Sequence, residues 1–92
     1  MRLRRWSEAK ATRVARRHAD YMLWHDGYPV SMLGHSANGP EGAVIVERQR
    51  PGWAVYRKRG AEQESLRHHQ DVARAYEDAL ELIYDICRAE GI

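Results

Sequence analysis

The segment "RPGWAVYRKRG" (50–60) combines arginine with aromatic side chains, the groups with which proteins hold anionic partners. A guanidinium pairs with a carboxylate or phosphate through two parallel hydrogen bonds, and an indole ring stacks on a base or fills a partner's pocket. With Trp53, the cations of residues 48–59 form the first candidate binding site, and their net charge is +5. These cations are Arg48, Arg50, Arg57, Lys58 and Arg59.

The exposed side of this segment depends on how its strands pair. In an extended strand, Trp53, Arg57 and Arg59 point to one side, and Tyr56 and Lys58 point to the other. If a helix covers the side with Tyr56, the tryptophan and its arginines share the open side. A slip of one residue exchanges the two sides, so the pattern leaves open which face is exposed. The alternative is an ordinary solvated strand with Trp53 at the edge of the core.

A second basic cluster lies in the expected first helix, on the side opposite most of its apolar residues. Its members are Arg13, Arg16 and Arg17, and Trp24 follows two turns later near the same side. Each cation that neutralises a phosphate releases counterions, so nucleic-acid binding here would weaken steeply with salt. Residues 1–6 are expected to fray, as chain ends do. Their cations are Arg2, Arg4 and Arg5.

Groups that could catalyse a reaction or hold a metal do not converge. Cys87 falls in the apolar stripe of the last helix, where a thiol behaves as a small hydrophobic group. His18 and His25 are seven residues apart, about 10 Å along a helix, which is too far for one zinc ion. We expect both histidines to be partly buried helix residues. The sequence therefore predicts no metal site and no cofactor.

Carboxylates also favour a non-catalytic interpretation. Glu77, Glu81 and Asp85 recur every four residues on the polar side of the last helix, where they suit solubility better than acid–base chemistry. The glycines of "GYPVSMLGHSANGPEG" (27–42) lack the strand–loop–helix spacing of a phosphate-binding loop. We therefore expect a protein that is not an enzyme, and a metal- or cysteine-dependent enzyme is the least favoured of three hypotheses.

Two helices flank the segments that carry these residues. Ser7 is the expected N-cap of a helix that runs to about Asp26 and ends at Gly27. The residues expected on its apolar side are Ala11, Val14, Ala15, His18, Tyr21, Met22 and His25. A second helix, from about Asp71 to Glu90, has the clearest amphipathic pattern of the chain. Its apolar stripe comprises Val72, Ala75, Tyr76, Ala79, Leu80, Leu82, Ile83, Ile86 and Cys87.

Between the helices, the sequence predicts an antiparallel meander. "AVIVERQ" and "WAVYRKR" are expected strands around a type II turn with Pro51 and Gly52 at its centre. "EQESLRH" predicts a third, polar edge strand. Residues 28–42 are rich in turn residues, "PVSML" could add a short strand, and a loop of this length is often a binding element. The pairing of residues 29–35 and 62–68 stays open.

Size and composition limit the chain to one small domain. Residues 1–92 are expected to form a single α+β domain: an N-terminal helix, a two- or three-stranded antiparallel meander, and a C-terminal amphipathic helix packed on the sheet. No apolar run is long enough to span a membrane, and the N-terminus lacks the apolar segment of a secretion signal. One cysteine fits a reducing compartment, so we expect a cytoplasmic location. Residues 60–92 carry a net charge of −5, which separates an acidic helix from the basic clusters.

Two resemblances bear on function. The order helix, three strands, helix is similar to double-stranded-RNA-binding domains, but the start of the last helix, "HHQDVARAYED", has only Arg74 where those domains hold phosphates with several cations. The segments "GAVIVERQRPGWAVYRKRG" and "VARAYEDALELIYDI" resemble the short meander and helix of small phage-borne inhibitors of the anti-CRISPR type. That resemblance implies a stoichiometric binder that obstructs a larger nucleoprotein machine.

These observations favour a non-enzymatic binding protein that docks a basic, Trp- and Arg-bearing face on a protein or nucleoprotein partner. The alternative is a module that binds DNA or RNA directly. The identity of the partner and the oligomeric state are not specified by the sequence. The residues expected to contact the partner are Arg13, Arg16, Arg17, Trp24, Arg48, Arg50, Trp53, Arg57 and Arg59.

Overall fold

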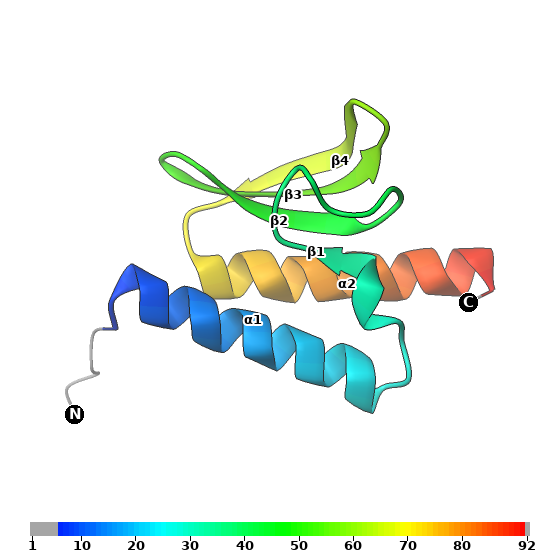
Figure 1. The fold of residues 1–92 in the computed structure, drawn as a ribbon, viewed down its shortest axis with the longest axis horizontal. Coiled ribbons are helices and arrows are strands. Elements are labelled where there is room, and N and C mark those ends of the chain that lie inside the picture. Colours follow the sequence, from blue (N-terminus) through cyan, green and yellow to red (C-terminus); the bar gives the residue numbers. More distant parts are fainter. Residues whose placement is uncertain (1–5, 92) are drawn as a thin grey trace.

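A computed structural model describes residues 6–91 and shows a sheet with two helices on one side (Figure 1). The order of elements confirms the expected α+β domain with an N-terminal helix and a C-terminal helix packed on the sheet. Among the described residues, neither helix is long and apolar enough to cross a bilayer. The elements are α1 (Glu8–His25), η1 (Val30–Met32), β1 (Leu33–Gly34), β2 (Val44–Gln49), β3 (Gly52–Arg59), β4 (Glu62–His69) and α2 (Val72–Glu90).

Helix α1 begins and ends where its capping residues predict. The Ser7 hydroxyl accepts a hydrogen bond from the backbone N–H of Lys10 at 3.1 Å, which satisfies one of the free amides of the first turn. At the other end, Gly27 adopts φ +80°, a conformation that glycine reaches without steric cost. The hydroxyl of Tyr84 donates to Asp26 at 2.8 Å and fastens this end of α1 to α2.

The apolar side of α1 is narrower than expected and rotated. Ala15, Ala19 and Leu23 are the buried residues, whereas Val14 and Tyr21 are 39% and 54% exposed. The expectation that His18 and His25 are partly buried is also wrong, because both are exposed. The reason is that α1 packs mainly on α2 and η1, so only one thin stripe of its surface is covered.

The sheet has four strands in the order β1-β2-β3-β4, one more than the largest number expected. Strands β2, β3 and β4 form the predicted antiparallel meander, and β4 is an edge strand as expected. The extra strand is β1, in which Leu33 and Gly34 pair in parallel with Val44 and Ile45. Of the segment "PVSML" (29–33), which could have added a short strand, only Leu33 lies in β1, and Val30–Met32 form η1 instead.

The turn between β2 and β3 differs from the expected type II turn. Its loop is Arg50–Pro51, joined by a cis peptide bond, and Gly52 is already the first residue of β3, paired with Gln49. Glycine is required at this position for another reason. A Cβ atom on Gly52 would overlap the backbone carbonyl of His69 in the neighbouring strand β4.

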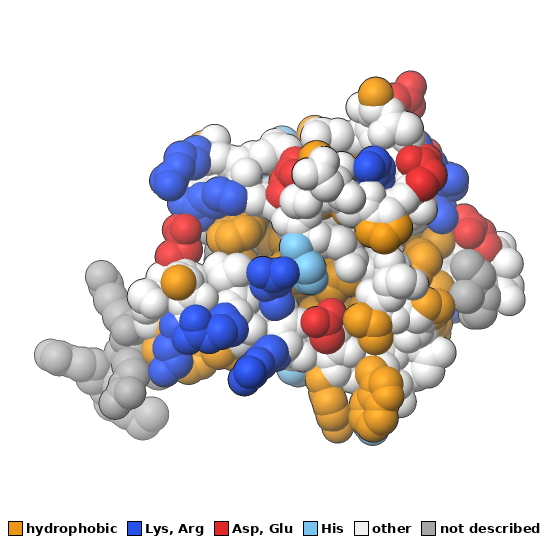
Figure 2. Space-filling view, in the orientation of Figure 1, with side chains coloured by type: hydrophobic (Ala, Val, Ile, Leu, Met, Phe, Trp, Pro, Cys, Tyr) orange, Lys and Arg blue, Asp and Glu red, His pale blue; other side chains and the backbone are white. Residues whose placement is uncertain are grey.

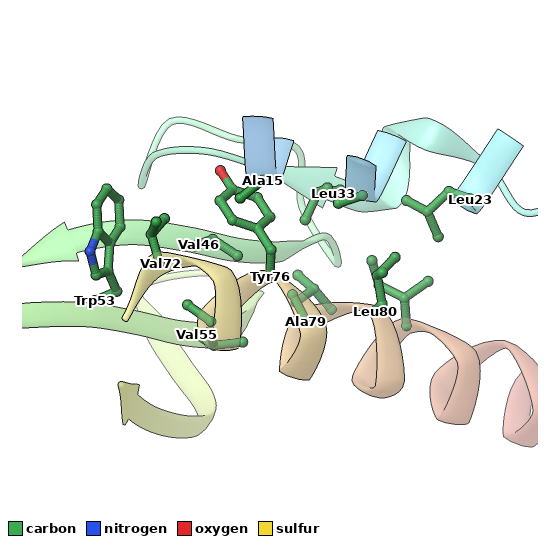
Figure 3. Packing of buried hydrophobic residues seen from close by; sticks show 14 of the residues in the cluster. Ala15, Leu23, Leu33, Val46, Trp53, Val55, Val72, Tyr76, Ala79 and Leu80 are labelled. Atoms are coloured by element: carbon green, nitrogen blue, oxygen red, sulfur yellow. The ribbon is translucent and has the colours of Figure 1, made fainter. Parts of the chain in front are cut away.

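Both faces of the sheet are covered. On one face, Val44, Val46, Trp53 and Val55 pack against α2 and α1, and Figure 3 shows Trp53 beside Val72 at the start of α2. On the other face, a smaller cluster of buried residues lies under the loop that follows β1. Its members are Ala43, Ile45, Ala54 and Tyr56.

The loop over the second face depends on glycines. A Cβ atom on Gly34 or Gly39 would lie 2.5 or 2.7 Å from Cδ1 of Ile45, so only a residue without a side chain lets the loop approach the sheet this closely. Lys58 extends under the same loop and donates to the carbonyl of Gly39 at 2.9 Å. The long segment expected as a binding element therefore serves as a cover for the sheet.

Helix α2 forms where its amphipathic sequence pattern predicts it. Asp71 accepts from the N–H of Ala73 at 3.2 Å, and Gly91 closes the C-terminus with φ +72°. Cys87 is fully buried. The three carboxylates at four-residue spacing are all exposed, as expected for the polar side of the helix. The acidic side of α2 therefore lies away from the sheet.

Candidate binding face

The Trp- and Arg-bearing side of β3 points inward, which corrects the expectation that it forms an open binding surface. Trp53 and Arg57 are each only 8% exposed. Helix α2 covers the side of β3 that bears Trp53 and Val55, while Tyr56 on the opposite side is buried by the loop. Since neither side of β3 is solvated over its first six residues, strand alternation alone could not identify an exposed face.

Arg57 is neutralised within the fold. Its Nη1 donates to Oε2 of Glu90 at 2.7 Å and its Nε donates to the carbonyl of Gly42 at 2.9 Å. The hydrogen bond raises the pKa of Arg57 and, from the other side, lowers the pKa of Glu90. A guanidinium whose donors are committed to these acceptors is not available to a partner.

The remaining strand cations of the first cluster also have internal acceptors. Arg48 pairs with Glu8 at 2.9 Å, and its guanidinium carbon lies 5.2 Å from the centre of the Trp53 ring. Arg59 lies 3.6 Å from Glu64 and 3.9 Å from Glu90. These two arginines connect elements of the domain instead of forming a free basic surface.

Arg50 is different because it lies at the tip of the β2–β3 hairpin. Its side chain is exposed, and within the described part of the chain no carboxylate lies within 4 Å of it. Of the five cations in residues 48–59, it is the arginine that remains available on geometric grounds.

The cations of α1 are exposed, as the sequence predicts. Arg13, Arg16 and Arg17 line one open hollow of about 470 Å³ together with Ala9, Thr12 and Asp20. Across residues 6–91, none of the three arginines has a carboxylate oxygen within 4 Å. Figure 2 shows Lys and Arg side chains gathered over α1 and the β2–β3 turn at the left of the view. Arg2, Arg4 and Arg5, which the sequence adds to this cluster, lie outside the described residues.

An exposed aromatic group lies beyond these arginines on the same helix. Trp24 is 70% exposed and follows Arg17 by seven residues, about 10.5 Å along the axis. Its ring centre lies 6.1 Å from that of Tyr21. We refer to Arg13, Arg16, Arg17 and Trp24 as the α1 basic face. It combines guanidinium groups with a stacking surface, the composition expected of a site that holds an anionic partner.

A hydrogen-bonded pair lies near the α1 basic face. Nδ1 of His35 lies 2.9 Å from the hydroxyl of Tyr76, which connects the loop after β1 to α2. Burial and the nearby charge of Arg16 lower the pKa of His35, and burial raises the pKa of Tyr76 to about 12. A neutral His35 adds no positive charge to the face, so its potential comes from the arginines.

Cys87, the cysteine considered as a possible nucleophile, is fully buried. Burial raises the pKa of Cys87, which disfavours the reactive thiolate. Within residues 6–91, no three His, Cys, Asp or Glu side chains are grouped so that they could hold a metal ion.

A second feature, which sequence reasoning missed, is an apolar groove between α1 and α2. It has a volume of about 310 Å³, and apolar side chains from both helices form most of its wall. The sequence did carry one sign of the groove, because Val14 belongs to the expected apolar side of α1. That side was wider than contact with a single neighbouring helix could bury. Which helix would share the groove depends on tertiary packing and cannot be inferred from periodicity.

Comparisons with protein-family models, with curated proteins and with solved structures find no match.

Proposed function

We propose that this chain is a non-enzymatic binding protein that docks its α1 basic face on an anionic surface of a protein or nucleoprotein partner. Arg50 at the hairpin tip supplies a further cation. Trp53 and Arg57 are no longer part of the proposed site, because both are buried.

One observation carries the proposal: the arginines of the sheet and those of α1 are treated differently by the fold. Arg48, Arg57, Arg59 and Arg67 each lie within 4 Å of a carboxylate. Arg13, Arg16 and Arg17 do not, within the described residues, although they share one hollow. Asp20 lines the same hollow but is one carboxylate among three guanidinium groups, so the like charges still repel one another, and an anionic partner relieves that repulsion.

The fuller form of the proposal is a phage-type inhibitor, such as an anti-CRISPR, that obstructs a nucleoprotein machine. Support comes from the resemblance in architecture and from the exposed arginines of the α1 basic face, which suit an anionic surface such as bound nucleic acid or an acidic protein patch. Direct binding of DNA or RNA is the alternative, and Trp24, exposed two turns from Arg17, favours it where bases are unpaired.

The test uses two probes of similar charge, a 20-nucleotide single strand and poly-L-glutamate, in a salt series. For the proposed face we expect both to bind, with the logarithm of affinity falling against that of salt concentration by a slope of roughly −2 to −3 for three arginines. On the single strand, the variant Arg13→Gln/Arg17→Gln should lose roughly 1.4 units of that slope. Its matched control is Arg74→Gln/Arg88→Gln, which removes the same charge from α2.

Equal losses in the two double variants would mean that net charge, and not the α1 basic face, determines binding, and would refute the proposal. Binding of the nucleotide strand alone, with loss on Trp24→Ala, would support the direct nucleic-acid alternative. Binding of both probes supports a face that recognises anionic surfaces generally.

A further inference from the structure

Asn38 and Gly39 form the single Asn–Gly pair of the chain, and Asn38 is its only asparagine. They lie in the β1–β2 loop, residues 35–43, which covers the second face of the sheet. Asparagine is one of the chemically labile side chains of proteins. A following glycine increases its reactivity, because no Cβ atom hinders the approach of the glycine nitrogen. Neither residue belongs to the α1 basic face.

The reaction open to this pair is deamidation. The backbone nitrogen of Gly39 attacks the side-chain carbonyl carbon of Asn38, and a new C–N bond forms while the C–N bond of the side-chain amide breaks. The proton of the Gly39 nitrogen passes to the leaving amide nitrogen, which departs as ammonia, and a five-membered succinimide ring remains. Water then opens the ring at either carbonyl, which yields aspartate or isoaspartate at position 38.

The side chain of this pair is accessible, but its attacking nitrogen is held. Asn38 is exposed, so water for ring opening is present. The N–H of Gly39 donates to the carbonyl of Ser36 at 2.9 Å. To attack, this nitrogen has to lose its proton, and its peptide plane has to turn towards the Asn38 side chain. The hydrogen bond to Ser36 opposes both changes.

Two further contacts hold Gly39 on the sheet. Nζ of Lys58 donates to the carbonyl of Gly39 at 2.9 Å. A Cβ atom on Gly39 would lie 2.7 Å from Cδ1 of Ile45, so the loop backbone packs directly on that side chain. Lys58 belongs to β3, 19 residues away in sequence, so its hydrogen bond exists only while the loop lies on the sheet. In the closed loop, Gly39 therefore lacks the rotation that ring closure requires.

We propose that Asn38 is a deamidation site that the closed β1–β2 loop protects, and that the hydrogen bond from Lys58 to Gly39 keeps the loop closed. Ring closure then occurs in molecules whose loop has opened locally, so the rate follows the population of the open loop. Isoaspartate inserts an extra methylene group into the backbone before Gly39. Since Gly39 has no free space towards Ile45, the longer backbone does not fit the same position on the sheet.

The first test compares the folded chain with the same chain unfolded in guanidinium chloride, at one pH and temperature. Deamidation lowers the formal net charge of +2 by one, so ion exchange separates the product, and mass spectrometry of the peptide locates it. We expect the folded chain to react slower by about tenfold or more, because even one hydrogen bond to a charged group protects by that factor. Equal rates in the folded and unfolded chains would overturn the proposal.

A pair of matched variants tests the role of Lys58. Lys58→Met removes the donor to Gly39 and keeps an unbranched apolar stem, so deamidation of the folded chain should accelerate roughly tenfold to a hundredfold. Lys10→Met makes the same change on α1, where Lys10 lies over the Trp6 ring, and should leave the rate unchanged. Equal acceleration in both variants would refute the role of Lys58.

Urea denaturation of the same variants separates local from global opening. If the acceleration in Lys58→Met is no larger than its loss of global stability predicts, deamidation proceeds through complete unfolding, and the loop is not the protecting element. An acceleration beyond that value supports opening of the loop alone.

The two products test the effect on the loop. In the closed loop, the N–H of Gly42 donates to the carbonyl of Lys58 at 2.9 Å. We expect hydrogen exchange at Gly42 to be faster in the purified isoaspartate product than in Asn38→Asp, which adds the same charge without the extra methylene. Equal exchange in the two would contradict the packing argument. Because none of these changes alters the α1 basic face, failure here leaves the proposed function standing, and the reverse also holds.

Discussion

Arg57 and Glu90 form an ion pair that joins the middle of the sheet to the last turn of α2. Their Nη1 and Oε2 atoms are 2.7 Å apart, and the arginine is almost completely buried. Since the strand and the helix end are 33 residues apart in sequence, the pair fixes how α2 lies on β3. The residue that sequence analysis assigned to partner binding is thus a tertiary contact.

We predict that Arg57→Met lowers the free energy of unfolding by about 2 kcal/mol, because hydrogen bonds to charged groups contribute roughly 1.5–3 kcal/mol each. The affinity for the nucleotide strand should not change. Urea denaturation gives the stability and the salt series gives the affinity. Arg59→Met is the matched control, and its partly exposed pairs should contribute less than about 1 kcal/mol.

Loss of binding in Arg57→Met at full stability would contradict this assignment. It would return β3 to the binding site and require the strand to be exposed in the active form.

The same ion pair predicts sensitivity to acid. In the folded chain, the hydrogen bond from Arg57 lowers the pKa of Glu90 below its ordinary value of 4.5. The unfolded chain therefore binds a proton before the folded chain does, so stability is fully present above pH 4.5 and is lost as pH falls through the lower, folded pKa. Urea midpoints from pH 6 to 3 should fall less in Glu90→Gln than in the parent chain. Parallel curves for the two proteins would show that the pair has no such role.

The elements with local signals were predictable, and the exposed face of β3 was not. Ser7, Gly27 and Asp71 act within one turn of a helix end, so both helices could be bounded from sequence. The face of β3 could not be assigned, because Trp53 and Tyr56 are buried on opposite sides of the sheet. Strand alternation identifies a face only when one side is solvated.

The loop over the second face of the sheet gives a packing prediction. Gly34→Ala should destabilise the fold by about 1–3 kcal/mol, because the new Cβ would lie 2.5 Å from Cδ1 of Ile45. Ile45→Val removes that Cδ1 atom, so Gly34→Ala should cost much less in the Ile45→Val background. Thermal or urea unfolding of the four proteins gives the coupling energy.

Gly52→Ala is the control for this cycle. Its Cβ would overlap the backbone of His69, which Ile45→Val cannot relieve. Additivity of Gly34→Ala and Ile45→Val would show that the loop does not contact the sheet there.

The candidate site was predictable in part for a related reason. Arg13, Arg16 and Arg17 were correctly expected on the outside of α1, because a helix exposes its polar side whatever it packs against. The neutralisation of Arg48 by Glu8 was not predictable, since these residues are 40 positions apart and meet only through tertiary packing. Charge counts along a sequence therefore overstate a basic surface wherever distant carboxylates return to it.

The titration of His35 reports on the α1 basic face. Burial and the charge of Arg16 lower its pKa from the ordinary value of 6.5, so the unfolded chain binds a proton first. The contribution of His35 to stability is therefore fully present above pH 6.5 and is lost as pH falls through the folded pKa. We expect the NMR titration midpoint of the His35 ring to lie below 6.5 and to move upward in Arg16→Gln. A bound strand whose phosphates neutralise Arg16 should also move the midpoint upward, whereas poly-L-glutamate should do so only if it occupies the same hollow. If the midpoint lies at or above 6.5 and none of these changes shifts it, the charge of Arg16 does not act on His35. The titration of His35 would then not report on the α1 basic face.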